Sequence, residues 1–361
     1  MTKAPAYIAA EALRHFAGDM LAKHGLPHDD AACVAEGLVE ANLRGVDSHG
    51  VSRIPMYCER LRRGVVNPRP KISMRSVTPA CALIDGDDGM GFLVGRRGMD
   101  AAIAMARDYG IGLVGARHST HYGMAALYVL QAIDAGMIGF AYTNASPALP
   151  VWGGRSAFLG ASPFAAGAPG GEKAPYVLDM AMTVIARGKI RLAAQRGEPI
   201  PEGLALDRDG RATTDAKQAF EGVCLPFGGV KGSALSMLME ILGGVLTGAN
   251  FAGDVKSLYF DHSAPQNVGH LFIAIRPDLF VPREEYGQRM DTLVERAKAC
   301  PKAEGFDEIL IPGEPEARTR AKRSRSGIPL TPDVIDALRI EADRAGVPFL
   351  RLSATPLAPL D

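Results

Sequence analysis

Gly110-Ile111-Gly112-Leu113-Val114-Gly115 matches the glycine pattern G-x-G-x-x-G of nucleotide-binding loops, but its neighbours occur in the wrong order. That fingerprint requires a strand before the glycines and a helix after them. Here the preceding residues, 95–109, predict a helix, and residues 111–114 predict a strand. Gly110 is therefore the residue that ends the helix. We expect a fold other than the Rossmann fold, in which any dinucleotide binds by another architecture.

Strands and helices alternate on both sides of this segment. Hydrophobic patterns predict strands over 80–85, 111–114, 137–143, 175–180 and 270–275, and helices over 5–23, 28–43, 48–62, 95–109, 122–135, 183–196, 232–247, 283–299 and 331–345. Strands gather in the middle of the chain, and helices dominate both ends. The sequence predicts an α/β fold with a mostly parallel or mixed sheet. We expect residues 1–115 and 280–361 to form a helical second domain, and residues 116–279 to form the α/β part.

The composition excludes several classes of protein. Lys plus Arg equals Asp plus Glu at 40 each, which argues against a nucleic acid or an anionic membrane as partner. The apolar segment 234–246 contains Glu240 and is too short to span a bilayer. Residues 5–23 carry charges in an amphipathic pattern, unlike a signal peptide. The 5 cysteines have no paired spacing, and their odd number indicates the reducing cytoplasm.

A candidate proton-transfer group lies in the run Arg44-Gly45-Val46-Asp47-Ser48-His49-Gly50-Val51-Ser52-Arg53. Asp47 or Ser48 is placed to cap the predicted helix. His49 titrates near neutrality, and Arg53 follows one turn later on the same helical face. A guanidinium grips a carboxylate with two parallel hydrogen bonds. The run predicts a site for a small carboxylate; the alternative is a surface His and Arg beside an ordinary helix cap.

Polar groups follow several predicted strands. His118 and His121 lie three residues apart without a third ligand, so we expect an anion site at this strand-to-helix turn rather than a metal. Thr143 and Asn144 end the next strand, where open α/β sheets bind ligands, although a plain turn fits as well. Asp179 ends an apolar strand, where it either caps a helix or orients a histidine.

Two basic segments lie in the second half of the chain. Lys231, flanked by glycines at a predicted helix start, suits a phosphate or carboxylate; the alternative is a simple loop. The basic run 318–325 is interpreted as a solvated loop that is able to touch a phosphate.

Taken together, these segments resemble the malate/L-lactate dehydrogenase family, which is distinct from the Rossmann-type dehydrogenases. The family also includes sulfolactate, ureidoglycolate and diketogulonate dehydrogenases and the Δ1-piperideine-2-carboxylate/Δ1-pyrroline-2-carboxylate reductases. The resemblance runs from about residue 5 to 350 and is carried by Arg44-Gly45-Val46-Asp47-Ser48-His49-Gly50 with Arg53, His121-Tyr122-Gly123, Thr143-Asn144, Leu178-Asp179-Met180-Ala181, Ala186-Arg187-Gly188-Lys189, Leu225-Pro226-Phe227-Gly228-Gly229 with Lys231-Gly232, and Ile311-Pro312-Gly313-Glu314.

The resemblance implies a non-Rossmann NAD(P)-binding fold, with 116–279 as the cofactor-binding part, and a homodimer. It makes His49 the proton donor, with Ser48 and Asp179 as relay partners, and assigns Arg53, Thr143 and Asn144 to the substrate. It implies no metal. It assigns these residues to the nicotinamide cofactor: His121, Tyr122, Gly123, Met124, Ala125, Asp179, Met180, Ala181, Lys231, Gly313 and Arg318.

We therefore expect a cytoplasmic NAD- or NADP-dependent oxidoreductase that acts on a 2-oxo or 2-hydroxy acid of the malate or lactate type. Lys231-Gly232-Ser233-Ala234 is more similar to the cyclic-imine reductases, so an NADPH-dependent reductase of a cyclic 2-imino acid is an alternative. A non-catalytic binding protein on the same fold is another. A hydrolase with Ser48 as nucleophile lacks the Gly-x-Ser-x-Gly turn that such enzymes use.

Overall fold

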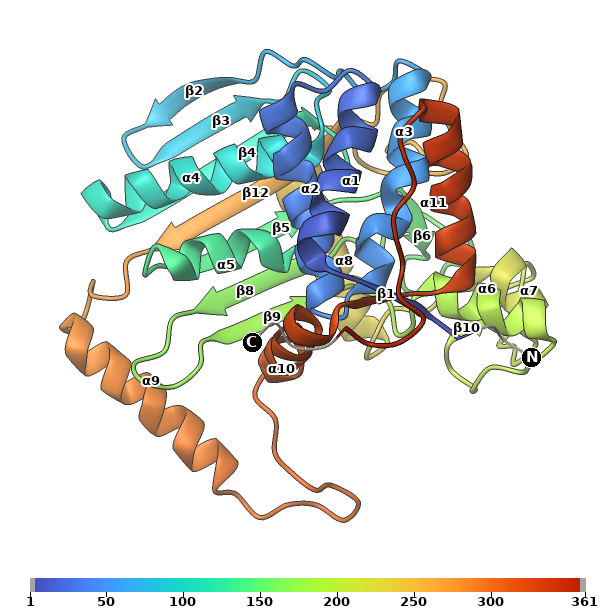
Figure 1. Cartoon of the computed structure of the whole chain (residues 1–361). Helices are drawn as coiled ribbons and strands as arrows, with labels where there is room; N and C mark the ends of the chain where they lie inside the picture. The colour runs from blue at the N-terminus through green and yellow to red at the C-terminus, as the bar shows by residue number, and fades with distance from the viewer. Residues whose placement is uncertain (1–3, 358–361) are drawn as a thin grey trace.

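A seven-stranded sheet forms the centre of the molecule in this computed structural model, which describes residues 4–357 (Figure 1). The strands, in spatial order, are β2 (Ser73–Thr78), β3 (Cys81–Asp85), β4 (Ile111–Ser119), β12 (Val268–Ile275), β5 (Ile138–Thr143), β8 (Phe164–Ala168) and β9 (Tyr176–Met180). Only β3 and β4 are parallel, and every other neighbouring pair in this sheet is antiparallel. The predicted mixed sheet is confirmed, and the mostly parallel alternative is wrong.

Helices cover both faces of this sheet. Helix α4 (Gly91–Tyr109) packs on β4 and β12, and α5 (Ala126–Asp134) packs on β5 and β8. Phe272 of β12 faces α4. Gly269 lies an odd number of residues before Phe272 and therefore on the opposite face of the sheet. It faces the π-helical turn Ile241–Val245, which continues α8 (Val230–Glu240). The central strands are therefore buried between two helical layers, whereas the edge strand β2 is exposed along its length.

The junction between α4 and β4 has the predicted order of helix, glycine and strand. Gly110 has φ +85° and donates its N–H to the Ala106 carbonyl, which ends the helix in the left-handed conformation. A Cβ on Gly112 would lie 2.1 Å from the Ala102 carbonyl oxygen in α4. These glycines serve chain reversal and close helix–strand packing, so the expected non-Rossmann fold is confirmed.

The two ends of the chain meet in a helical layer beside the sheet. It consists of α1 (Ala10–Lys23), α2 (His28–Leu43), α3 (Ile54–Arg62) and α11 (Pro332–Ala345), and the pair β1 (Ala6–Ile8) and β13 (Ile328–Leu330) joins its ends (Figure 1). The predicted domain boundaries stay predictions. Strands β2 and β3 and helix α4, which they assign to the helical part, lie in the sheet layers.

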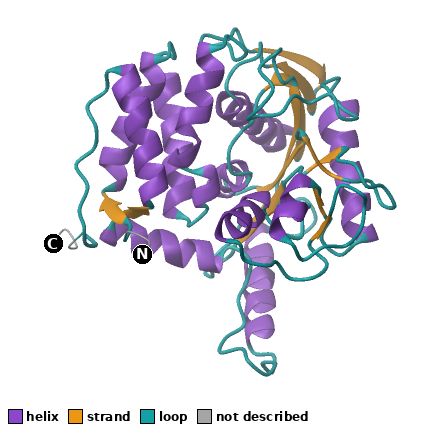
Figure 2. Ribbon diagram, turned by 90° about the vertical axis from the view of Figure 1, so that its right-hand side faces the viewer, coloured by secondary structure: helices purple, strands orange, loops and turns teal. Residues whose placement is uncertain are grey.

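The remaining elements form a smaller unit and an arm. The unit has its own core around Leu149, Met182 and Ile200 and comprises β6 (Pro147–Leu149), β7 (Leu159–Gly160), α6 (Arg187–Arg196), β10 (Ala205–Leu206), α7 (Ala216–Glu221) and β11 (Val223–Cys224). The arm, α9 (Arg283–Lys298) with the loop after it, extends away from the sheet (Figures 1 and 2). No helix among residues 4–357 is long and apolar enough to cross a membrane.

Several sequence predictions need correction. The helix predicted over 5–23 begins only at Ala10, because Ala6–Ile8 form strand β1, and the helix predicted over 183–196 begins only at Arg187. The basic run 318–325 lies in a helix, α10 (Glu314–Ser326), rather than in a loop. The helix predicted over 122–135 begins only at Ala126. The helix predicted over 48–62 is divided into two 3₁₀ turns, Asp47–His49 and Val51–Arg53, followed by α3.

Candidate active site

The two 3₁₀ turns that carry His49 and Arg53 are moulded around Asn42, which is buried in α2. Asn42 Oδ1 accepts a hydrogen bond from the Val51 N–H at 2.9 Å. A Cβ on Gly50, the residue between the turns, would lie 2.1 Å from Asn42 Oδ1. Only glycine fits there without moving Asn42, so Gly50 sets how closely the segment approaches α2.

The sequence predicted that Asp47 caps a helix; in the structure it anchors this segment instead. Its carboxylate accepts hydrogen bonds from Arg323 Nη1 at 2.7 Å and Nη2 at 3.0 Å, and from Asn42 Nδ2 at 2.6 Å. Neither Asp47 nor Ser48 makes a side-chain cap. The basic helix α10 therefore stabilises the segment that carries His49 through a paired arginine fork.

His49 is the centre of the candidate site. Its Nδ1 lies 3.0 Å from Ser48 Oγ, and Arg53 Nε donates to the Ser48 carbonyl at 2.6 Å. The imidazole is partly exposed, yet protein surrounds it closely. Burial, and then the charge of Arg53, lowers the pKa of His49 to about 3. The free protein therefore holds His49 neutral at physiological pH, as a proton acceptor.

A second histidine, His121, stacks against His49 with ring centroids 5.6 Å apart and an interplanar angle of 18°. The Gly123 N–H donates to His121 Nδ1 at 3.3 Å, so the Tyr57 hydroxyl, 2.7 Å away, must donate to the same nitrogen. Burial, and then Arg53, lowers the pKa of His121. Tyr57 was not among the residues predicted from the sequence; its spacing of four residues from Arg53 was the available signal.

A buried network at the start of β12 is centred on His270. His270 Nδ1 lies 2.8 Å from Thr143 Oγ1, and Nε2 lies 2.8 Å from Ser119 Oγ. Its ring stacks on Tyr122 at 4.6 Å and 2°. Burial lowers the pKa of His270 to about 3. The sequence analysis missed His270 because it stood merely as the first residue of a predicted strand.

Thr143 and Asn144, predicted to contact the substrate, are both buried and already hydrogen-bonded. Besides His270, Thr143 Oγ1 bonds to the Gly269 carbonyl at 3.1 Å. Asn144 accepts from the Gly269 N–H at 3.0 Å and donates to the Asn250 carbonyl at 2.6 Å. These bonds give both side chains a structural role, and a contact with substrate stays a prediction.

Asp179 caps a helix, although not the one that follows it in sequence. Its Oδ2 accepts from the Ala126 N–H at 2.8 Å, at the start of α5. Burial raises the pKa of the Asp179 carboxyl to about 6, against the opposing effects of that N–H and of Arg44. The side chain still reaches solvent. A relay to His49 stays a prediction.

The predicted cofactor residues fall into three places. Gly123, Met124 and Ala125 lead into α5 beside Asp179, whereas the Tyr122 ring is buried in the core. Gly313 starts α10 against β9, and the Pro312 carbonyl accepts from the Val177 N–H at 3.0 Å. Arg318 lies in the same helix, α10, and pairs with Glu308 at 2.9 Å. The third place is the first turn of α8, where Lys231 is exposed. Met180 and Ala181 end and follow β9.

Metal-ligating side chains gather at one place in the described part of the chain, among His24, Cys58 and Glu341. The guanidinium of Arg62 already occupies this cluster: it pairs with Glu341 and donates to His24 Nε2 at 2.9 Å. His118 contacts Asp85 at 2.9 Å and does not converge with His121. A metal ion would have to displace a paired cation from a buried carboxylate.

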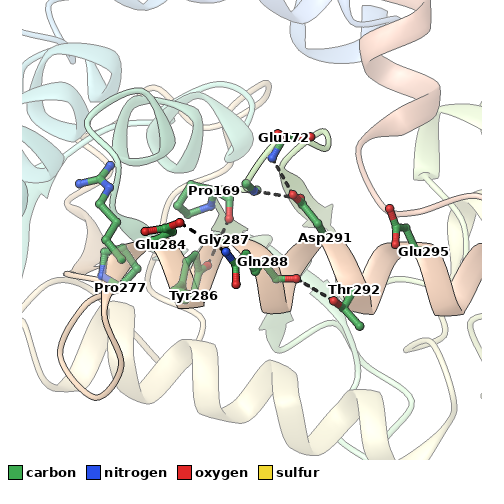
Figure 3. Close-up of a pocket in the computed structure, with 13 residues that line it drawn as sticks. Pro169, Glu172, Pro277, Glu284, Tyr286, Gly287, Gln288, Asp291, Thr292 and Glu295 are labelled. Carbon is green, nitrogen blue, oxygen red and sulfur yellow. Dashed lines mark hydrogen bonds between the residues drawn. The ribbon is translucent and has the colours of Figure 1, made fainter.

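A surface hollow lies outside this grouping of residues. About 940 Å³ in volume, it opens between α9 and the loop after β8 (Figure 3). Figure 3 shows Asp291 directed at that loop, where it accepts the N–H groups of Gly171, Glu172 and Lys173 at 2.7–3.0 Å. Tyr286 Oη also donates to the Pro169 carbonyl at 3.2 Å, and Lys173 pairs with Glu295 at 3.2 Å, so several contacts join the arm to this loop.

The chain is similar in sequence to known dehydrogenases over most of its length. A family model described as malate/L-lactate dehydrogenase matches residues 8–339. The malate dehydrogenase of Pyrococcus horikoshii is 41% identical over 336 residues, covering 91% of this chain and 92% of that protein. The L-sulfolactate dehydrogenase of Methanocaldococcus jannaschii is 41% identical over 329 residues, covering 91% of this chain and 94% of that protein.

Solved structures of dehydrogenases and of a related reductase have the same fold as this chain. The sulfolactate dehydrogenase structure from Methanocaldococcus jannaschii superimposes with a TM-score of 0.89 at 39% identity, covering 94% of this chain and 98% of that one. The Δ1-piperideine-2-carboxylate reductase from Pseudomonas syringae superimposes with a TM-score of 0.84 at 28% identity, covering 93% and 99%.

Proposed function

The chain belongs to the malate/L-lactate dehydrogenase family, and on this premise we propose that it transfers a hydride between a nicotinamide cofactor and the second carbon of a small 2-oxo or 2-hydroxy acid. Its relatives are dehydrogenases, so it is an oxidoreductase. The observation that carries the more specific proposal is the grouping of Ser48, His49 and Arg53 beside His121.

Proton transfer is the task of His49 in this proposal. The nicotinamide, when bound, accepts or supplies the hydride. During oxidation the substrate hydroxyl gives its proton to His49, whose neutral state suits acceptance. Ser48 contacts Nδ1 and so leaves Nε2 for the substrate. In reduction, a carboxylate bound at Arg53 offsets the positive charge that helps to lower the pKa of His49, which favours protonation.

The residues present fit a dinucleotide without a glycine fingerprint. Gly228 has φ +57° with open space where a side chain would be, and Gly229 has φ +64° immediately before α8. The helix has no side-chain cap, and Lys231 is exposed in its first turn. Free N–H groups and a lysine at a helix start suit a pyrophosphate. We propose NAD or NADP as the cofactor.

A cyclic 2-imino acid is the second candidate substrate, with NADPH as the reductant. The likeness to the piperideine-carboxylate reductase structure supports it, as does Lys231-Gly232-Ser233-Ala234. Both substrate classes present a carboxylate beside an electrophilic carbon, so the same Arg53 and His49 serve either.

We propose that the protein acts in the cytoplasm as a homodimer. The thiols of Cys33, Cys58, Cys81, Cys224 and Cys300 are all free, as a reducing compartment favours. Apolar side chains are exposed along α8 and the turn after it, among them Leu238, Ile241, Val245 and Leu246. Such a surface is suited to a second subunit. Light scattering of the purified protein measures the subunit number.

The test of the function is a substrate panel followed by the absorbance of reduced nicotinamide. NADH and NADPH are each tried with pyruvate, oxaloacetate, sulfopyruvate, 2,3-diketogulonate and Δ1-piperideine-2-carboxylate. We expect turnover with at least one 2-oxo or 2-imino acid. Cofactor binding without turnover of any of them would favour the non-catalytic binding protein, and ester hydrolysis without cofactor would favour the hydrolase.

A further inference from the structure

The loop of residues 256–263, which is distant from α3 in the sequence, lies against this helix, which follows the segment of His49 and Arg53. Arg60, fully buried in α3, fastens it: Nη1 donates to the carbonyls of Ser257 at 3.3 Å and Asp261 at 3.2 Å, and approaches that of Leu258 at 3.5 Å. A buried guanidinium is costly unless its donors are used, and here Nη1 alone is used, since Nε and Nη2 are buried without a partner. The loop carbonyls therefore compensate part of the cost of burying Arg60. Arg60 thus fixes the position of the loop relative to α3 and Arg53.

The loop directs Tyr259 at Arg53. Ser257 Oγ accepts the N–H groups of Tyr259 at 3.4 Å and Phe260 at 3.3 Å, which shapes the turn. Arg53 Nη1 donates to the Tyr259 hydroxyl oxygen, and the Arg53 Cζ lies 5.3 Å from the centre of the Tyr259 ring. The ring and the hydroxyl both contact the guanidinium that the proposed function assigns to the substrate.

This contact is not needed to hold the loop, because Arg60 already does so. Tyr259 is 51% exposed, whereas Arg60 is fully buried. The Tyr259 oxygen accepts from Arg53, so its own O–H hydrogen remains available as a donor. A guanidinium and a phenolic O–H in contact offer donors at one point to the oxygens of a carboxylate.

We propose that Tyr259 is a substrate-binding residue, whose hydroxyl and the Arg53 guanidinium together bind the substrate carboxylate. The inference rests on the proposed function for the identity of the ligand. It adds to the site a residue 206 positions from Arg53 in sequence. It also explains why a partly exposed tyrosine is kept against the arginine by a separately anchored loop.

Tyr259→Phe tests this assignment, because it keeps the ring and its contact with the guanidinium but removes the hydroxyl. We expect the KM for the carboxylate substrate to rise by about tenfold, the usual effect of losing a hydrogen bond to a charged group. The kcat and the KM for the cofactor should stay within about twofold. Tyr109→Phe is the matched control, since Tyr109 is an exposed tyrosine at the end of α4. Melting curves of both variants should match the wild type.

A binding measurement separates this proposal from the proposed function. Oxalate, a non-reacting dicarboxylate, is titrated into wild-type and Tyr259→Phe protein saturated with reduced cofactor. Weaker binding to the variant, by a factor similar to the rise in KM, supports Tyr259 even when no substrate of the panel reacts. Equal oxalate affinity overturns the assignment, as does a fall in kcat at unchanged KM. Wild-type protein that neither binds oxalate nor turns over any acid overturns both proposals.

Discussion

The neutral state of His49 predicts different pH dependences for the two directions of the reaction. With a pKa of about 3, the protonated fraction of the imidazole falls tenfold for each pH unit above that value. Oxidation of the hydroxy acid uses the neutral form, so its kcat/KM should be constant between about pH 5 and pH 9. Reduction uses the protonated form, so its kcat/KM should fall by about tenfold per pH unit over the same range.

The assay is a series of initial rates in both directions with the cofactor at saturation. The positive charge of an oxidised nicotinamide can only lower the pKa of His49 further, so the oxidation profile is the cleaner one. An oxidation rate that rises to a plateau through about pH 6.5, with a flat reduction rate below it, would refute the reasoning, since His49 would then titrate as an ordinary imidazole. His15→Gln is the control: this exposed histidine of α1 should leave both profiles unchanged.

Four further substitutions test separate parts of the structure. Arg53→Lys loses a forked grip on the carboxylate, so the substrate KM should rise by about tenfold or more while cofactor affinity, measured by fluorescence, stays the same. Gly112→Ala places a Cβ 2.1 Å from a carbonyl oxygen of α4, so the melting temperature should drop while the folded protein keeps its cofactor affinity. Lys231→Ala should instead weaken cofactor binding and leave the melting temperature unchanged. Lost cofactor affinity in folded Gly112→Ala protein, with normal affinity in the Lys231→Ala variant, would show that the glycine fingerprint binds the cofactor. Gly50→Ala pushes the catalytic turn away from α2, so kcat should fall more than thermal stability, and an unchanged kcat would contradict the role of that close approach.

The sequence predicted the parts of the fold that local patterns determine. The reversal at Gly110 depends on a left-handed residue between two apolar segments, and both features are visible in the sequence. Strand β8 was missed because Phe164–Ala168 consists mainly of Ala and Gly, which carry little strand preference. Helix α10 was taken for a loop because it buries no residue and is tied to the molecule by ion pairs of Arg320 with Glu40 and Arg323 with Asp47.

The site was predictable only where its residues are neighbours in sequence. Ser48, His49 and Arg53 stand within one short run, and the structure keeps them in contact with one another. Tyr259 contacts Arg53 from 206 positions away in the sequence, and His270 of β12 stacks on Tyr122, the neighbour of His121. No spacing rule connects such residues, because the sheet order and the Arg60 anchor determine their positions.

The most direct test of the central claim, that His49 exchanges the proton that accompanies hydride transfer, is single-turnover reduction by the His49→Asn variant. Cofactor affinity is measured on the same preparation by fluorescence. The variant should bind the cofactor as the wild type does but lose roughly 10²–10⁴-fold in the rate of the chemical step, as expected for the loss of a general acid. A chemical step within about threefold of the wild-type rate, with normal cofactor binding, would contradict the claim.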